Sequence, residues 1–299
     1  MKRERSFEGI FPAVITPFDD SSEIDEQRMG DFIDYVIEGG VHGIYLLGTN
    51  GEAPLLTLNE KKRIIGAAMR KVNGRVPVIA GTMCNSTKKT LELSRYAEKK
   101  GADAVHAIVP YYYPVTEGSL KEHIEQIADE IDIPIFLYSI PQFTGNEIKT
   151  STVSKLVDIK DLIGLKDSSS DVEWFYQTLE KVRKKREDFV LFGGNDSLIY
   201  TYLTLGGDGA VTAIGNAFPS LVVDIYEKFK AGNFEEAKKK QRRVLEIKNI
   251  FDHYPTMSAV KGALKVKGRD YGDLRKPLYS LDKSELKSLE EGLKKIDVI

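Results

Sequence analysis

Residues 161–168 read Asp-Leu-Ile-Gly-Leu-Lys-Asp-Ser, a short apolar run that ends in a lysine and is followed by a helical stretch over 171–184. A short apolar run bounded by turn residues predicts a buried strand, and a strand followed by an amphipathic stretch predicts one β–α unit of a parallel sheet. In such a unit Lys166 lies at the C-terminal end of the strand, with its side chain directed into the fold. Burial disfavours the charged form of an amine, so an amine there can act as a nucleophile near neutral pH. The alternative, a surface lysine in a turn, is the commoner arrangement.

The same β–α unit recurs along the chain. Short apolar runs alternate with stretches of helical periodicity, and Asn59 is the expected N-cap of the second helix. Eight units predict an α/β fold of the (β/α)8 TIM-barrel type, in which closure hides the edges of the sheet. The predicted strands are 9–16, 43–47, 76–80, 104–109, 133–138, 162–165, 189–192 and 209–212. The predicted helices between them are 25–38, 62–72, 87–100, 119–130, 151–157, 171–184 and 197–205.

From Pro219 onward the pattern is helical only, and no low-complexity linker separates this part from the rest. We interpret residues 1–230 as the barrel and residues 231–299 as a C-terminal helical extension of the same unit. The helices predicted in this part are 220–230, 234–251, 257–266 and 283–295.

The composition restricts the classes of partner. The chain has 299 residues, of which 41% are hydrophobic and 29% charged, as in soluble globular proteins. Its 43 basic and 45 acidic residues give a formal net charge of −2, so no basic surface for nucleic acid or an anionic membrane is expected. The predicted partner is therefore a small neutral or anionic molecule.

Cysteine and histidine usage predicts neither a disulfide nor a metal. The single cysteine, Cys84, excludes an intrachain disulfide and a multi-cysteine zinc site, and fits a reducing cytosol. The charged N-terminus lacks an apolar segment behind it and no apolar run is long enough to span a bilayer, so we expect no signal peptide, no membrane association and a cytoplasmic location. No metal or organic cofactor is expected, because ligand spacing is absent among His42, His106, His123 and His253.

The loops after the predicted strands are rich in groups that handle protons and carboxylates. In a barrel of this type these loops build the active site. Loop 48–52, Gly-Thr-Asn-Gly-Glu, offers backbone N–H groups and a hydroxyl for a carboxylate, although such a sequence is more often only a turn. Loop 110–114, Pro-Tyr-Tyr-Tyr-Pro, predicts an aromatic lid or a subunit interface. Tyr138 ends the fifth strand and Lys166 the sixth, which together give an amine nucleophile, a proton shuttle and a carboxylate site, the equipment of a Schiff-base enzyme.

Four segments with matching order and spacing carry a family resemblance: 48–52 (Gly-Thr-Asn-Gly-Glu), 110–112 (Pro-Tyr-Tyr), 138–141 (Tyr-Ser-Ile-Pro) and 164–166 (Gly-Leu-Lys). The chain resembles the dihydrodipicolinate synthase / N-acetylneuraminate lyase family of DapA-like class I aldolases, from about Gly9 through the helical tail. The resemblance implies a barrel with a C-terminal helical extension, assembled as a homotetramer that is a dimer of dimers. It also implies a reaction without a metal or an organic cofactor.

The resemblance implies roles for individual residues. Lys166 would attack the ketone of pyruvate, or of a longer 2-oxo acid, to form a Schiff base, and Tyr138 would shuttle the proton. Thr49 would link Tyr138 to Tyr112, which a neighbouring subunit contributes. The residues that would contact the substrate are Asn50 at its carboxylate, Val211 in the pyruvate pocket, and Ser168, Gly194 and Asp196 at its hydroxyl groups.

The sequence departs from two members of the family at the substrate tail. Dihydrodipicolinate synthases carry an arginine in the loop after the strand-five tyrosine, where Phe143 stands here, and phenylalanine cannot bind a carboxylate in a bidentate manner. Sialic acid lyases carry an acidic residue after the strand-seven aspartate, where Ser197 stands. Asn50 replaces a second hydroxyl residue. The resemblance therefore favours the 2-keto-3-deoxygluconate aldolase type, which cleaves a 2-keto-3-deoxy sugar acid to pyruvate and an aldehyde.

Several alternatives stay open at this point. One is a 4-hydroxy-tetrahydrodipicolinate synthase or an N-acetylneuraminate lyase. Another is a dehydratase of a keto-deoxy sugar acid, which uses the same lysine but expels water from the enamine. A third, from a different class, is a catalytically silent barrel that binds a 2-oxo acid as a sensor. A metal-dependent class II aldolase is disfavoured by the histidine spacing.

Overall fold

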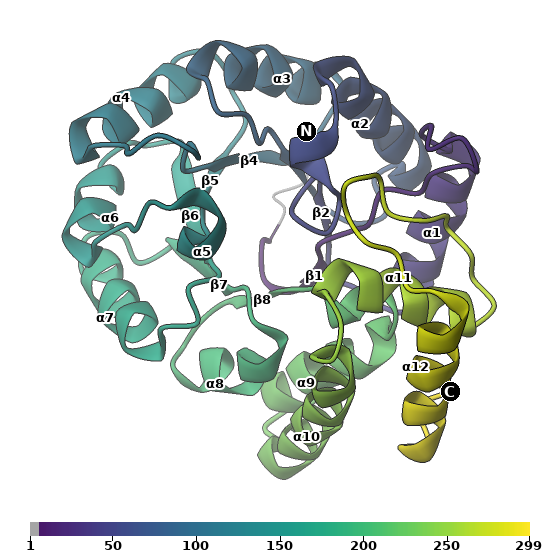
Figure 1. Ribbon diagram of the computed structural model, residues 1–299. Helices are drawn as coiled ribbons and strands as arrows, with labels where there is room; N and C mark the ends of the chain where they lie inside the picture. Colours follow the sequence, from purple (N-terminus) through teal and green to yellow (C-terminus); the bar gives the residue numbers. More distant parts are fainter. Residues whose placement is uncertain (1–5) are drawn as a thin grey trace.

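Eight parallel strands form the core of the computed structural model, which describes residues 6–299 (Figure 1). Neighbouring strands follow the order β1-β8-β7-β6-β5-β4-β3-β2, so each strand lies beside its neighbours in the sequence and β8 lies beside β1. The strands are β1 (Gly9–Pro12), β2 (Ile44–Leu46), β3 (Val78–Gly81), β4 (Ala104–Ile108), β5 (Ile135–Ser139), β6 (Leu162–Asp167), β7 (Val190–Gly193) and β8 (Gly209–Thr212). The predicted TIM barrel is confirmed.

The last junction of the barrel lies between β1 and β2. Ala13 and Tyr45 form an isolated parallel bridge there, and the N–H of Val14 donates to the Tyr45 carbonyl at 3.0 Å. The first strand is shorter than the predicted 9–16, because regular pairing ends at Pro12 and only the contacts of Ala13 and Val14 continue it. Beyond it, Thr16 donates its hydroxyl to the Gly51 carbonyl at 2.6 Å, so this segment binds a loop instead of a strand.

Helices surround the barrel and continue past its last strand (Figure 1). They are α1 (Glu26–Glu38), α2 (Leu58–Val72), α3 (Thr87–Lys99), α4 (Glu117–Ala128), α6 (Thr150–Leu156), α7 (Val172–Arg183), α8 (Ile199–Thr204), α9 (Pro219–Lys230), α10 (Phe234–Phe251), α11 (Thr256–Val266) and α12 (Lys283–Lys295). All of the predicted helices are present, with most ends within a few residues of the expected ones. The predicted C-terminal helices are therefore confirmed, whereas the boundary at residue 230 stays a prediction.

The N-cap predicted for α2 is wrong. Asn59 lies inside the helix, and Thr57 is the N-cap. Thr57 Oγ1 accepts from the Glu60 N–H at 3.3 Å, and the Glu60 carboxylate accepts from the Thr57 N–H at 2.7 Å. Such a reciprocal capping box satisfies two free N–H groups, whereas an asparagine two residues further on satisfies none in this geometry.

Short helices also occur in the loops, where the sequence predicted none. Each is a single turn, too short to show hydrophobic periodicity. They are η1 (Ala53–Leu55), α5 (Pro141–Thr144) and η3 (Ile214–Asn216), and η2 (Asp196–Leu198) precedes α8. All four turns follow strands, namely β2, β5, β7 and β8, on the face where the strands end.

The interior of the barrel is filled by side chains in layers, as this fold requires. Among them, Phe136 and Phe192 stack with ring centroids 5.8 Å apart. Phe136 is in register with Gly164, and a Cβ at Gly164 would collide with the Phe136 ring. Because side chains alternate along a strand, the next inward position after Gly164 is Lys166. Gly164 thus leaves space for the Phe136 ring, and Lys166 lies one layer nearer to the C-terminal ends of the strands.

The C-terminal helices lie against one side of the barrel (Figure 1). Helix α10 packs on α9, and α11 lies near the loop that follows β2. Within residues 6–299, no helix combines the length and the apolar character needed to cross a membrane.

Candidate active site

Lys166 is buried inside the barrel and is not a surface lysine. It lies in β6 with 3% of its surface exposed, and it is in register with Tyr138 of β5. The Nζ atom lies 4.1 Å from the centroid of the Tyr138 ring and 4.6 Å from that of Tyr45. The amine is thus held between two aromatic rings at the C-terminal ends of the strands.

Tyr138 and Thr49 form a hydroxyl pair beside this amine. The Tyr138 OH and the Thr49 Oγ1 are 3.3 Å apart, and either oxygen can be the donor. Thr49 belongs to the loop that follows β2, so the pair connects β5 to that loop. A phenol next to an amine and in contact with a second hydroxyl can pass a proton between the reacting atoms and the exterior of the site.

The loop 48–52 is fixed by buried polar contacts. The Glu52 carboxylate forms an ion pair of 2.9 Å with Lys261 of α11, and both side chains are almost completely buried. Glu52 Oε2 also accepts from the backbone N–H of Arg275 at 2.8 Å. Burial raises the pKa of Glu52 and lowers that of Lys261, while the attraction between the two charges opposes both shifts. Residues from the C-terminal extension therefore hold the loop that carries Thr49 and Asn50.

Asn50 and Val211, predicted to contact the 2-oxo acid, are both buried. Asn50 follows Thr49 in the loop, and Val211 lies in β8 among the inward-facing residues of the barrel. Both belong to segments at the C-terminal face, which is the face where Lys166 ends β6.

Ser168 and Gly194 border the reactive lysine. The Ser168 N–H donates to the Ser139 carbonyl at 2.9 Å, which continues the pairing of β5 and β6 past the strand end. A Cβ at Gly194 would collide with Ser168 Oγ and lie 3.1 Å from Lys166 Cε. The close approach of the chain to the lysine therefore requires glycine at this position.

The Asp196 carboxylate binds two backbone N–H groups of its own chain. Its two carboxylate oxygens accept from the N–H groups of Ala213, at 3.0 Å, and Ile214, at 3.2 Å. Burial raises the pKa of Asp196 to about 6, and the two hydrogen bonds oppose that rise. The carboxylate thus fixes the turn after β8, which is a positioning role that the sequence did not reveal.

Tyr112 lies apart from the hydroxyl pair within one chain. It is 82% exposed, has a φ of 83° and packs its ring edge-on against Tyr113 at 4.9 Å. Over residues 6–299 it makes no hydrogen bond to Thr49 of its own chain. An aromatic side chain held outward in a left-handed backbone conformation is strained and exposed, which fits a contact with another subunit.

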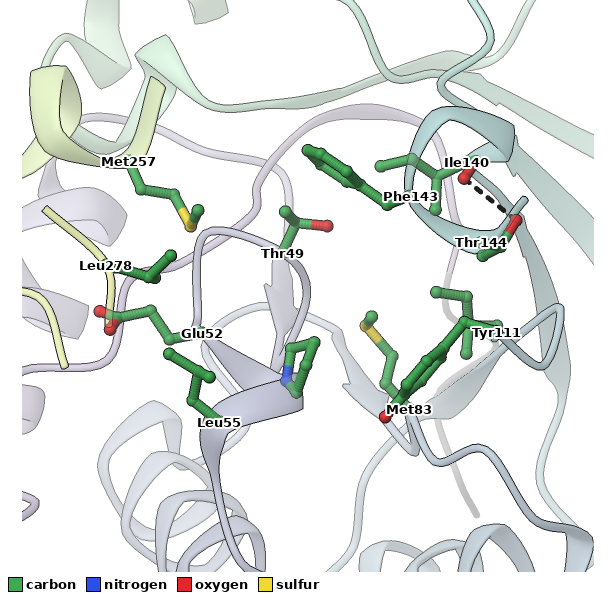
Figure 2. A pocket seen from close by; sticks show the side chains of 12 residues that line it. Thr49, Glu52, Leu55, Met83, Tyr111, Ile140, Phe143, Thr144, Met257 and Leu278 are labelled. Atoms are coloured by element: carbon green, nitrogen blue, oxygen red, sulfur yellow. Dashed lines mark hydrogen bonds between the residues drawn. The ribbon is translucent and has the colours of Figure 1, made fainter. Parts of the chain in front are cut away.

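A cavity of about 270 Å3 opens beside Thr49. Figure 2 shows Thr49 between Phe143 and Ile140 on one side and Met257 and Leu278 on the other. Phe143, which the resemblance places where some members of the family carry an arginine, is 65% exposed and lies at the rim. The complete lining is Thr49, Glu52, Pro54, Leu55, Met83, Ile108, Tyr111, Ile140, Phe143, Thr144, Met257 and Leu278.

Two residues near the amine were not predicted, Tyr45 and His106. Their rings are stacked, with centroids 4.0 Å apart and an angle of 14°. His106 Nε2 lies 3.0 Å from the Leu46 carbonyl, which only accepts, so Nε2 carries the proton. Burial lowers the pKa of His106 to about 3, and the charge of Lys166 adds to the effect. Both residues lie inside apolar runs of the sequence, where the pattern predicts a buried side chain of the core and does not indicate a site residue.

No group of three or more His, Cys, Asp and Glu side chains within residues 6–299 is placed to hold a metal ion.

Comparison with known proteins shows the family of this chain. The model of the dihydrodipicolinate synthetase family matches residues 6–296. A DapA-like lyase of Halobacterium salinarum is 39% identical over 285 residues, covering 95% of this chain and 92% of the relative. The 4-hydroxy-tetrahydrodipicolinate synthase of Methanopyrus kandleri is 35% identical, covering 98% of this chain and 97% of the relative.

Solved structures give the same result. YagE, a prophage protein of the dihydrodipicolinic acid synthase family from E. coli K12, was solved in complex with pyruvate. It superimposes with a TM-score of 0.94 at 31% identity, covering 98% of this chain and 99% of YagE. The chain belongs to the dihydrodipicolinate synthetase family. It is an enzyme of the lyase class, of the class I aldolase type that works through a lysine Schiff base.

Proposed function

We propose that Lys166 forms a Schiff base with pyruvate or a pyruvate-derived 2-oxo acid, and that the enzyme makes or breaks a carbon–carbon bond next to it. The observation that carries this proposal is the burial of the Lys166 amine beside the Tyr138 phenol, with Nζ 4.1 Å from the ring centroid. YagE, similar over nearly its whole length, was solved with pyruvate, which supports the same ligand here.

The adduct acts as an electron sink. The amine nitrogen of Lys166 attacks the ketone carbon, and the ketone oxygen leaves as water after it has been protonated. The protonated imine then withdraws electrons from the adjacent carbon, so a bond at that carbon can break to give an enamine, or form from it. Tyr138 and Thr49 are the groups placed to deliver and remove the protons.

The carboxylate of the 2-oxo acid belongs at the loop 48–52. Thr49 offers a hydroxyl there, and the buried Asn50 offers an amide. The ion pair of Glu52 with Lys261 holds the loop in place at 2.9 Å, which keeps these donors oriented before the substrate arrives.

For the complete reaction we favour reversible cleavage of a 2-keto-3-deoxy sugar acid to pyruvate and an aldehyde. Phe143 at the rim offers no charge for a second carboxylate, while Ser168 borders the amine and offers a hydroxyl to a substrate hydroxyl. Pyruvate and glyceraldehyde supplied together should then yield a keto-deoxy sugar acid. If neither this product nor its cleavage is detected while a pyruvate adduct forms, the sugar-acid substrate is wrong and the Schiff base remains.

The second candidate is 4-hydroxy-tetrahydrodipicolinate synthase, the activity that names the Methanopyrus kandleri relative. Formation of that product in a coupled assay would favour it over the sugar acid. Product analysis also separates the dehydratase, which gives an unsaturated or rearranged acid without an aldehyde. A barrel that only senses a 2-oxo acid would bind pyruvate without any turnover.

The active form is proposed to be a homo-oligomer, a tetramer built as a dimer of dimers. Tyr112 is 82% exposed in one chain and therefore free to reach the Thr49–Tyr138 pair of a neighbour. In this arrangement the hydroxyl relay is complete only across a subunit interface, so the monomer lacks one proton-transfer group.

A further inference from the structure

The second aromatic ring at the Lys166 amine belongs to Tyr45, which has no part in the reaction proposed above. Nζ lies 4.6 Å from the Tyr45 ring centroid and 4.1 Å from that of Tyr138. The two rings are nearly perpendicular, at 84° with centroids 6.0 Å apart. The nitrogen therefore lies in a corner formed by two aromatic faces.

The strands β2, β3 and β4 place Tyr45 there. His106 reaches across β3 to the Leu46 carbonyl of β2 and stacks on the Tyr45 ring. The His106 ring can cross β3 because residue 81 of that strand is a glycine, which has no side chain in the way. A Cβ at Gly81 would lie 2.6 Å from His106 Nε2. Three strands thus cooperate to hold one phenol ring against the amine.

The stacked pair of Tyr45 and His106 lowers the stability of the folded state. The Tyr45 OH and His106 Nδ1 are both completely buried, and within residues 6–299 neither has a hydrogen-bond partner. A buried polar atom without a partner destabilises the folded state, whereas leucine or phenylalanine would fill the same layer without that penalty. A merely space-filling role therefore does not explain this pair.

We propose that Tyr45 is a further catalytic residue, whose ring face, together with that of Tyr138, stabilises positive charge on the Lys166 nitrogen, and that His106 positions it. The inference rests on the Schiff-base function proposed above. An aromatic face attracts a cation through its quadrupole, and the attraction is stronger where water is excluded, as at these two rings.

The charge balance of the adduct step shows where the rings act. The neutral amine, the pyruvate ketone and one proton give the iminium and one water molecule. A C–N bond forms, the carbon–oxygen bond of the ketone breaks, and the oxygen leaves in the water molecule. The nitrogen changes from neutral to cationic, so rings that favour the cation favour the iminium over the amine and over the neutral enamine.

His106 suits the positioning role because it stays neutral. Its Nε2–H is fixed on the Leu46 carbonyl at 3.0 Å, and burial lowers its pKa to about 3. A second cation in the barrel would repel the iminium, whereas a neutral imidazole only packs against the Tyr45 ring. The iminium is then the single cation between the two phenols.

The test compares Tyr45→Phe, which keeps the ring, with Tyr45→Leu, which removes it. The measured quantity is the pyruvate concentration that gives half-maximal borohydride-trapped adduct, in acid and in alkaline buffer. In alkaline buffer Tyr45→Leu should need about tenfold to thirtyfold more pyruvate. In acid buffer the increase in the pyruvate requirement of Tyr45→Leu should be smaller. The Lys166 nitrogen is then an ammonium ion before the reaction, so it is a cation beside the rings both before and after the iminium forms. Tyr45→Phe should stay within about twofold of wild type in both buffers and unfold at a higher temperature.

Controls separate a loss of packing from a loss of the ring face. Tyr226→Leu removes another buried tyrosine, on α9 and outside the barrel interior, and should leave the pyruvate requirement unchanged. If Tyr45→Leu does not fold, Tyr45→Met replaces it with an unbranched, flexible side chain that can adapt to the space left by the ring. An equal effect of Tyr45→Leu in acid and alkaline buffer, no effect at all, or an equal loss in Tyr45→Phe would overturn the proposal. Absence of any adduct with the wild-type enzyme would instead overturn the proposed function on which it rests.

Discussion

At the level of single residues, Lys166 is buried among aromatic rings, and within residues 6–299 no carboxylate forms an ion pair with it. The two ring centroids lie 4.1 and 4.6 Å from Nζ. A ring face stabilises a cation through its quadrupole without forming an ion pair with it. The two rings are therefore placed to stabilise the positive charge that the nitrogen carries in the iminium.

The hydroxyl pair predicts the effect of Thr49→Val. Removal of the Thr49 hydroxyl leaves the Tyr138 OH without its partner at 3.3 Å, so proton transfer should slow by about a hundredfold. Exchange of the pyruvate methyl protons for deuterium, followed by NMR, measures this step without any aldehyde. Thr204→Val, at an exposed position on α8, is the matched control and should exchange at the wild-type rate. A wild-type rate in Thr49→Val would exclude Thr49 from the relay.

His106 predicts how stability depends on pH. Its pKa is about 3 in the folded protein against 6.5 in the unfolded chain, so below pH 6.5 the unfolded chain binds a proton that the folded protein does not. The stability from burying the neutral ring is thus complete above pH 6.5 and is lost as the pH falls towards 3. Relative to His106→Gln, the wild type should lose about 2 kcal/mol of unfolding free energy between about pH 7 and pH 5.

Urea unfolding at a series of pH values measures that difference. Glutamine at position 106 keeps a donor for the Leu46 carbonyl but does not titrate. His253→Gln, the same substitution at an exposed position, is measured beside it as the control. If the unfolding free energies of the wild type and His106→Gln changed with pH in the same way, His106 would take up its proton in the folded state as well, which would contradict the prediction.

The sequence was sufficient for those site residues that follow directly from a strand end. Lys166, Tyr138 and Thr49 could be predicted because the ends of parallel strands meet on one face. Tyr45 and His106 could not, because their contact depends on the register of three strands and on the space left by a glycine in β3. For Asp196 the residue was singled out, but its bonds to the backbone depend on the path of the turn after β8.

At the level of elements, the loop after β2 is held by the C-terminal helices. Glu52 from this loop and Lys261 from α11 form an ion pair of 2.9 Å with almost no exposure to water. Two charges buried together stabilise each other, but either one alone would be buried without compensation. The helical extension is therefore coupled to the loop for which we propose binding of the substrate carboxylate.

This ion pair predicts a pattern of stabilities. Lys261→Met leaves Glu52 buried and unpaired, which should lower the unfolding free energy by about 3 kcal/mol. The double variant Glu52→Gln with Lys261→Met removes both charges and should recover at least half of that loss. Lys265→Met, on the same helix but at a partly exposed ion pair with Asp270, should cost less than about 1 kcal/mol. Equal stabilities of the single and double variants in urea unfolding would show that the pair is not coupled.

The elements themselves were predictable to different degrees. Long helices such as α10 were predicted to the residue, because their apolar positions repeat over several turns. The one-turn helices after β2 and β5 were not predicted, because a single turn carries no periodicity. The start of α2 was misplaced for another reason, since Asn59 and Thr57 are both good capping residues and only Thr57 has a glutamate three positions later.

At the level of the whole molecule, barrel closure collects the reactive groups on one face, while the most exposed aromatic side chains of residues 6–299 lie outside the closed interior. Tyr112, Tyr113 and Phe143 are all mostly exposed, and Phe143 forms the rim of the cavity at Thr49. The barrel and its helical tail could be predicted from the repeated β–α pattern. The place of Tyr112 could not be derived from one chain, because its proposed partner belongs to a second copy.

A mixing experiment tests the proposed subunit contact. Lys166→Ala and Tyr112→Phe should each be nearly inactive alone. In a mixed dimer, the Tyr112→Phe subunit keeps its lysine and receives Tyr112 from its partner. Equal amounts of the two variants, unfolded and refolded together, should therefore recover about a quarter of the wild-type exchange rate. No recovery in mixtures that contain mixed dimers would place Tyr112 outside the neighbouring site.

The most direct test of the account is borohydride reduction in the presence of pyruvate, followed by peptide mass mapping. The account predicts one reduced pyruvate adduct per chain, on the peptide that contains Lys166, and none in Lys166→Ala. An adduct on another lysine, or no adduct in enzyme that is folded and saturated with pyruvate, would contradict it.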